Sequence, residues 1–224
     1  MQEFLGFQFE ILSKPHNKNS YIKITKEGKL VFSYPSRFPN KLYNAKQYIM
    51  QNQDYIRKNY QDFFQKKNAR QKNLQKYVTT YLHKYPNSLI IFDKAYEVDG
   101  LSIEILSKIL YDKSYKLLCE MADIMKLGFD GLSISYANSY LGQCRNRYIK
   151  IDYRNVLSPE HLLRYLVIHE LSHIRYANHS SKFWNEVGKF YNEYKIAKKE
   201  IKILATNHAE VLRHYNLLPK SYKN

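Results

Sequence analysis

The sequence has little cysteine, and this scarcity argues against two kinds of site. Only two cysteines occur among the 224 residues, Cys119 and Cys144. Two are too few for a disulfide framework in a chain of this length. Neither belongs to a CxxC pair, so we do not expect a zinc site built from thiolates. We expect both to be reduced, partly buried thiols.

Long hydrophobic runs are also missing. The first residues, MQEFLGFQFEILSKPHNK, contain neither the basic segment nor the long apolar segment of a signal peptide. The apolar run LLRYLVI is short and contains Arg164, so it does not resemble a membrane span. We therefore expect a cytoplasmic protein with no membrane partner.

Acidic residues are few relative to basic ones. The chain has 20 Asp and Glu against 36 Lys and Arg, a formal net charge of +16, and a sequence pI near 9.6. Such a balance favours polyanionic partners such as nucleic acid, nucleotides or acidic proteins. Biased genome composition is an equally good explanation, because the chain is rich in Lys, Asn, Ile and Tyr together. Charge alone decides nothing here.

Glycine and proline are absent from residues 40–85, where apolar residues recur at helical spacing. This pattern predicts helix. The polar stretch 65–73 interrupts it and is either a solvated length of helix or a break between two helices. Two alternating runs upstream, 21–25 and 29–33, flank a short turn that contains glycine and predict a β-hairpin.

Downstream, the patterns predict alternating strands and helices. Apolar periodicity predicts a helix over 102–127, with Gly128 as its stop signal. Alternating runs predict strands at 132–136 and 148–153, and the apolar run 89–92 is either a buried strand or the start of the next unit.

The richest motif is VIHELSHIRYANHSSKFW, Val167–Trp184. Its helix starts well, because the Ser158 hydroxyl can cap free backbone N–H groups and Pro159 suits the first turn. His169 and His173 are four residues apart and therefore share one helix face. Their imidazole nitrogens can take adjacent corners of a tetrahedron around Zn²⁺.

A third ligand and a base complete the motif. Glu170 lies about 100° round the helix from His169 and can act as general base on a metal-activated water, as in HExxH hydrolases. His179 follows His169 by ten residues, the offset of the third histidine in HExxHxxGxxH metalloproteases. We expect Asn178 to adopt the left-handed turn that brings His179 back, and Ser180 or Ser181 to cap the next helix. Three nitrogen ligands favour zinc, although nickel, cobalt and iron are compatible with them.

The remaining histidines have no partner at ligand spacing. We expect all five on the surface: His16, His83, His161, His208 and His214.

The motif resembles a family signature. HELSHIRYANHSSKFW is similar to the HELxHxxxxxHSxxFW signature of the YgjP-like metal-dependent hydrolases, which belong to the zincin-like peptidases. Upstream, LGQC matches the family's W-G-S-C turn at Gly142 and Cys144 and departs from it at Leu141 and Gln143. The resemblance implies metal ligation by His169, His173 and His179, and Glu170 as general base.

The resemblance also implies a fold. We expect an α+β chain in which residues 1–100 form a β-hairpin and basic helical region. Residues 101–224 would then form a zincin-like hydrolase domain whose active-site helix packs on a small sheet.

Several functions fit these observations. The first is a zinc-dependent metallopeptidase acting on peptides. The second is hydrolysis of a nucleoside triphosphate such as UTP with release of pyrophosphate, an activity that the resemblance implies; the chain has no GxxxxGK[ST] loop, so Lys, Arg and the metal would hold the phosphates. The third is a DNA-associated protease that resembles the SprT-like proteases, with nucleic acid bound by the basic helices. A basic binding protein with a structural zinc is the non-enzymatic alternative.

Overall fold

The computed structural model describes residues 1–37 and 39–222, in two compact units, Met1–Asn73 and Leu74–Asn224. Helices and small sheets occur together, so the predicted α+β class is confirmed. The domain boundary predicted between residues 100 and 101 lies inside the second unit. Among the described residues, no helix is both long enough and apolar enough to cross a membrane.

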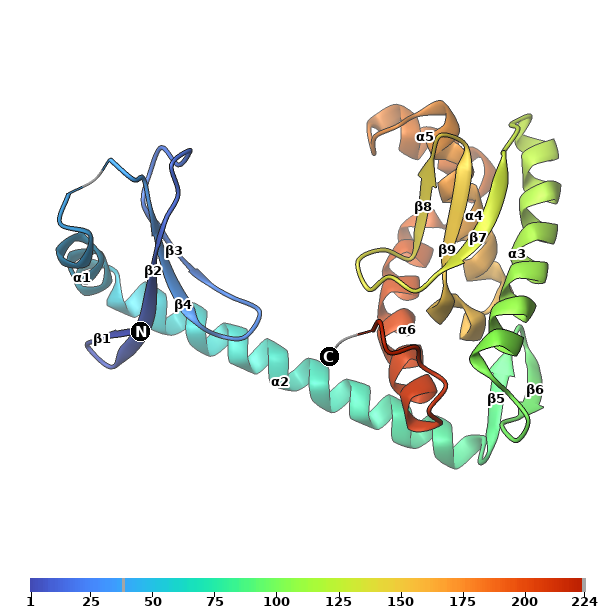
Figure 1. Cartoon of the computed structure of the whole chain (residues 1–224), viewed down its shortest axis with the longest axis horizontal. Coiled ribbons are helices and arrows are strands. Elements are labelled where there is room, and N and C mark those ends of the chain that lie inside the picture. Colours follow the sequence, from blue (N-terminus) through green and yellow to red (C-terminus); the bar gives the residue numbers. More distant parts are fainter. Residues whose placement is uncertain (38, 223–224) are drawn as a thin grey trace. The chain divides into compact units, whose positions relative to one another are not determined.

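The first unit contains a four-stranded sheet with the order β1-β2-β4-β3 (Figure 1). The hairpin predicted at 21–33 is confirmed, since β3 and β4 pair antiparallel with Tyr21 opposite Ser33. Strands β1 and β2 were not predicted. The elements of this unit are β1 (Gln2–Phe4), β2 (Phe7–Ser13), β3 (Tyr21–Ile24), β4 (Leu30–Tyr34), α1 (Lys41–Gln51) and most of α2 (Gln53–Lys84).

Helices α1 and α2 account for the long stretch without glycine or proline. The break between them falls at Asn52, whose side-chain amide donates a hydrogen bond to the carbonyl oxygen of Tyr48 at 2.9 Å. The polar stretch 65–73 is helical and exposed throughout, so it is a solvated length of helix rather than a break. Buried side chains of the unit, including Phe9, Phe32 and Ile49, form its core.

The second unit surrounds a three-stranded sheet with the order β7-β9-β8 (Figure 1). Strand β9 is central, parallel to β7 and antiparallel to β8. The predicted helices and strands of this region are present, whereas β6, β8 and α6 were not predicted. The elements are β5 (Ser88–Ile91), β6 (Lys94–Glu97), α3 (Ile103–Met125), β7 (Gly131–Ser135), β8 (Gly142–Arg145), β9 (Tyr148–Asp152), the 3-10 helix Tyr153–Leu157, α4 (Glu160–Arg175), α5 (Ser181–Phe190) and α6 (Tyr194–His214).

Helix α4 is the central helix of this unit, because it packs against β8, α3, α5 and α6. One side of it is fully buried, including Leu163, Val167 and Leu171. Burial of this apolar face fixes the direction in which the opposite face of the helix points.

Two helix ends differ from the predictions. The Ser158 hydroxyl does not cap α4, whose N-cap is Pro159 without a side-chain hydrogen bond; instead it donates to the Asn155 side chain at 3.5 Å. Helix α3 stops at Met125, before Gly128, because Lys126 takes the left-handed conformation with φ 52°. In this position the Lys126 N–H bonds back to the last turn of the helix, so glycine is not needed for the stop.

Candidate metal centre

Helix α4 brings the first two histidines together. The imidazole rings of His169 and His173 have centroids 5.0 Å apart, as expected for residues one turn apart on one face. The His173 Nδ1 atom contacts the carbonyl oxygen of Tyr176 at 3.1 Å. This contact fixes the ring orientation and leaves Nε2 free to bind a metal.

The chain returns His179 to this face without a left-handed residue. After α4 the C-cap Tyr176 is extended, with φ −133° and ψ 103°, and Asn178 has no positive φ. The prediction for Asn178 is therefore wrong, because an extended exit already reverses the chain. Ser180 caps α5 as predicted, with its hydroxyl accepting from the N–H of Phe183.

The three histidines converge. One nitrogen from each of His169, His173 and His179 lies within 4.8 Å of the others. The Nε2 atoms of His169 and His179 are 3.1 Å apart. Two ligands of a tetrahedral zinc with bonds of roughly 2.0–2.1 Å lie roughly 3.3 Å apart. The donor set therefore fits a divalent metal.

Electrostatics keep the three rings ready to bind a metal. Burial, together with the charges of neighbouring imidazoles and lysines, lowers the pKa of His169 to about 3, and burial is the largest cause. Burial also lowers the pKa of His173 and His179. All three rings are therefore neutral at pH 7, as metal ligation requires.

Glu170 is buried beside the histidines. Glu170 is only 3% exposed, and this burial raises the pKa of its carboxyl group to about 8. Strand β8 crosses close above it: a Cβ added at Gly142 would lie 2.4 Å from Glu170 Oε1. Glycine at this position is what allows the strand to pass so near the carboxyl group.

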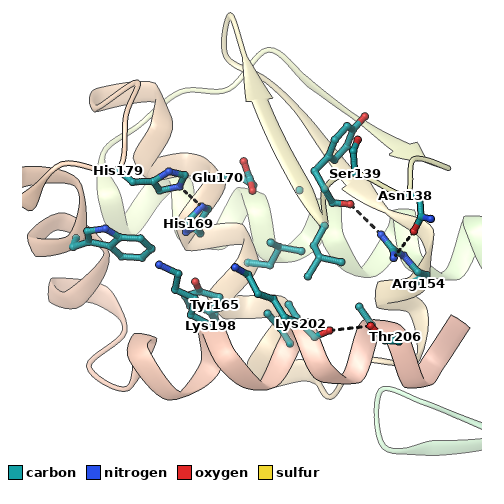
Figure 2. Close-up of a pocket in the computed structure, with 17 residues that line it drawn as sticks. Asn138, Ser139, Arg154, Tyr165, His169, Glu170, His179, Lys198, Lys202 and Thr206 are labelled. Atoms are coloured by element: carbon teal, nitrogen blue, oxygen red, sulfur yellow. Dashed lines mark hydrogen bonds between the residues drawn. The ribbon is translucent and has the colours of Figure 1, made fainter. Parts of the chain in front are cut away.

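A cavity of about 570 Å³ opens beside this cluster (Figure 2). His169, Glu170 and His179 line it on one side. Lys198 and Lys202 of α6 face them. These two lysines were not predicted, because α6 carries several lysines and only packing decides which of them face the cavity.

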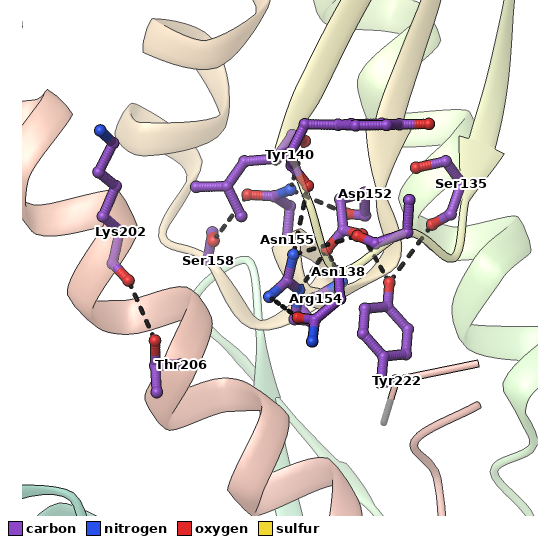
Figure 3. Close-up of polar contacts among 12 residues, drawn as sticks. Ser135, Asn138, Tyr140, Asp152, Arg154, Asn155, Ser158, Lys202, Thr206 and Tyr222 are labelled. Carbon is purple, nitrogen blue, oxygen red and sulfur yellow. Dashed lines mark hydrogen bonds and ion pairs between the residues drawn. The ribbon is translucent and has the colours of Figure 1, made fainter. Parts of the chain in front are cut away.

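Arg154 lines the same cavity from a buried polar cluster (Figure 3). Its guanidinium donates to Asp152 Oδ1 at 2.6 Å, to Asn138 Oδ1 at 3.1 Å and to the carbonyl oxygen of Tyr140 at 3.2 Å. The Tyr222 hydroxyl donates to Asp152 Oδ2 at 2.6 Å. The cluster thus ties the loop before β8 to the end of β9. The sequence offered no signal for it, since its members are far apart along the chain.

Four of the five remaining histidines are exposed as predicted: His16, His83, His161 and His214. His208 is an exception. It is 2% exposed on the inner face of α6, and burial lowers its pKa to about 4.

Residues 94–203 match the family model described as YgjP-like, metallopeptidase domain. This region is a YgjP-like metallopeptidase domain. The match spans β6 through the first half of α6 and contains all three histidines. A YgjP-like domain implies a metal-dependent hydrolase, and the histidine cluster can hold its divalent metal.

Two solved structures are similar to part of the chain. The zymogen of Pyrococcus abyssi abylysin, a metallopeptidase, is 25% identical with a TM-score of 0.37, and the match covers 39% of this chain and 90% of that one. The metallopeptidase zymogen of Methanocaldococcus jannaschii jannalysin is 21% identical with a TM-score of 0.36, covering 39% and 92%. A search of curated proteins gave no match.

Proposed function

We propose that this protein is a zinc-dependent metallopeptidase in which His169, His173 and His179 bind zinc and Glu170 is the general base. One observation carries the proposal. Three neutral imidazoles converge beside a buried carboxyl group at the wall of a cavity of about 570 Å³. This combination serves hydrolysis, because it brings a metal site, a base and space for substrate together.

Zinc is the metal that this donor set favours. Three imidazole nitrogens and an open fourth position are typical of catalytic zinc, whereas magnesium and calcium prefer oxygen ligands. Bound zinc supplies Lewis acidity, which acidifies a water molecule and polarises the bond under attack.

Glu170 has the properties of a general base. It is next to His169 in sequence but points from a different side of α4, so it can receive a proton without ligating the metal. Burial raises its pKa to about 8, and a pKa near the working pH suits a group that takes a proton and then returns it. Glu170 takes the proton of the attacking water and passes it to the leaving amine.

The test compares zinc-loaded wild type with Glu170→Gln on a mixture of fluorogenic peptides. We expect the variant to lose at least about 100-fold in kcat/KM while retaining one zinc, since the base has gone and the ligands have not. Glu97→Gln, which changes an exposed carboxylate on β6, is the matched control and should cleave like wild type. Equal cleavage by Glu170→Gln and wild type would instead assign the zinc a structural role.

Hydrolysis of a nucleoside triphosphate is the second candidate. The observation that favours it is the pair of lysines, Lys198 and Lys202, that lines the cavity, because ammonium groups attract phosphate oxygens. Pyrophosphate release from UTP by wild type, lost in Glu170→Gln, would favour this candidate over the peptidase.

A further inference from the structure

Two ammonium groups share the cavity with the metal centre. Lys198 and Lys202 are four residues apart on α6 and project from the same face toward His169 and His179 (Figure 2). The same face presents Ile201, Ala205 and Thr206 to the cavity. By contrast, Lys195 and Lys199 of this helix are exposed and do not line it.

Neither lysine has an acidic partner. Within the part of the chain that the structure describes, no carboxylate forms an ion pair with Lys198 or Lys202. Glu170 is the single acidic side chain among the described residues that line the cavity, and it is buried in the opposite wall. Two like charges one turn apart repel each other. This wall of the cavity therefore carries uncompensated positive charge.

Lys198 is held beside the third histidine. Its Nζ atom lies 3.9 Å from the centroid of the Trp184 ring, within cation–π range. The Trp184 ring in turn stacks on His179, with centroids 5.4 Å apart and an angle of 18° between the planes.

We propose that Lys198 and Lys202 form an anion-binding subsite, which holds a carboxylate or phosphate group of the substrate next to the bond that is hydrolysed. This inference rests on the proposed hydrolase function and adds a substrate class to it. An anion between the two ammonium groups relieves their repulsion and makes charge-assisted hydrogen bonds with both. Because both lysines lie on one helix that lines the cavity, this contact also sets the position of the substrate relative to the three histidines.

Binding to metal-free protein tests the subsite separately from catalysis. Isothermal titration calorimetry at one fixed salt concentration uses two anionic probes, UTP and the peptide acetyl-Glu-Glu-Glu-amide. Their uncharged counterparts are uridine and acetyl-Gln-Gln-Gln-amide. The proteins are wild type, a Lys198→Gln/Lys202→Gln double variant, the charge-preserving Lys198→Arg/Lys202→Arg variant and the matched control Lys199→Gln.

We expect wild type, the arginine variant and Lys199→Gln to bind at least one anionic probe and neither uncharged one. The glutamine double variant should bind that probe about 100-fold more weakly, since each hydrogen bond to a charged group contributes roughly tenfold. Preference for UTP would identify phosphate as the anion, and preference for the acidic peptide would identify carboxylate. Either preference supports the subsite.

The subsite is overturned if wild type binds neither anion, or if the glutamine double variant binds as tightly as wild type. An equal loss in Lys199→Gln would overturn it too, because that loss would reflect general surface charge. Hydrolysis by the zinc-loaded proteins is then measured separately. Cleavage of a neutral peptide without anion binding would contradict the subsite and support the hydrolase function. Anion binding without cleavage of any substrate would support the subsite and contradict the hydrolase function.

Discussion

Glu170 is positioned by packing rather than by an ion partner. Its carboxyl group lies under β8, where Gly142 leaves just enough room for it. Burial is the cause of its raised pKa. The position of the Glu170 carboxyl group therefore depends on the size of the side chain at position 142.

We therefore predict that Gly142→Ala impairs catalysis without removing the metal. The added methyl group would lie 2.4–2.8 Å from three Glu170 side-chain atoms, so the carboxyl group must move. A displacement of this kind lowers kcat about 100-fold and overpacking costs roughly 1–3 kcal/mol of stability. Steady-state kinetics and zinc content check this, with Gln143→Ala on the same strand as control. Full activity in Gly142→Ala would show that the position of Glu170 is not critical.

Burial of His208 makes the stability of the fold depend on pH. Its pKa is about 4 when folded, because the ring is buried, and about 6.5 when unfolded. Between these values the unfolded chain binds the proton and the folded chain does not, so stability falls as the pH drops from about 6.5 to about 4.

The loss attributable to His208 is at most about 3 kcal/mol. Urea unfolding of the metal-free protein at pH 7 and pH 4.5 should show a smaller loss for His208→Gln than for wild type. His214→Gln, which changes an exposed histidine, should behave like wild type. Identical losses in all three proteins would contradict this role.

The sequence predicts which residues of the candidate metal centre lie together better than it predicts the lining of the cavity. His169, Glu170, His173 and His179 are close along the chain, so helix geometry and one short loop suffice to bring them together. Lys198, Lys202 and Arg154 meet them through tertiary packing alone. For His208 a signal existed and was missed, since Ile201, Ala205, His208 and Leu212 follow one buried stripe of α6.

At the scale of elements, the sequence predicts the helices before α6 and the strands with clear alternation, but not α6 itself. It misses β6 and β8 for the same physical reason. Each is joined to its partner by two residues with positive φ, Phe92 and Asp93 in one hairpin and Asn146 and Arg147 in the other. Turns of this type are usually recognised by glycine. Neither of these two turns contains glycine, so the sequence does not reveal them.

Helices α4 and α5 are tied together by an ion pair between a half-exposed arginine and a buried glutamate. The Arg175 guanidinium donates to Glu186, and its second nitrogen donates to the carbonyl oxygen of Met125 at 3.2 Å. Glu186 is 1% exposed and also accepts from Lys189 at 3.0 Å. The pair lies on either side of the loop that carries His179.

Arg175→Leu should destabilise the protein by roughly 1–3 kcal/mol, because it removes one of the two partners of a buried carboxylate. Lys108→Leu, which breaks an exposed ion pair with Asp112, should cost less than about 1 kcal/mol. Urea unfolding measures both. A cost for Arg175→Leu no larger than that for Lys108→Leu would show that the pair does not support the fold.

At the scale of the whole molecule, the chain combines a YgjP-like domain with an N-terminal sheet and helices. The predicted boundary at residue 100 stays a prediction, as does nucleic-acid binding by the basic helices between Lys46 and Lys84. The proposed metal centre lies within one of the two compact units. Metal should therefore stabilise that unit alone.

Differential scanning calorimetry checks this. Zinc at about 1,000 times its Kd should add roughly 4 kcal/mol to the unit that binds it. We expect one unfolding transition to move to higher temperature on zinc addition and to return on chelation, while another transition keeps its midpoint. Equal movement of every transition would contradict the assignment of the metal to one unit.

Zinc content after equilibrium dialysis tests the central claim most directly. Wild type should retain one zinc per chain. His179→Ala should lose most of its affinity because one of three ligands is gone, whereas His161→Ala, at an exposed position on the same helix as His169, should match wild type. Equal zinc retention by His179→Ala and wild type would contradict the three-histidine metal centre.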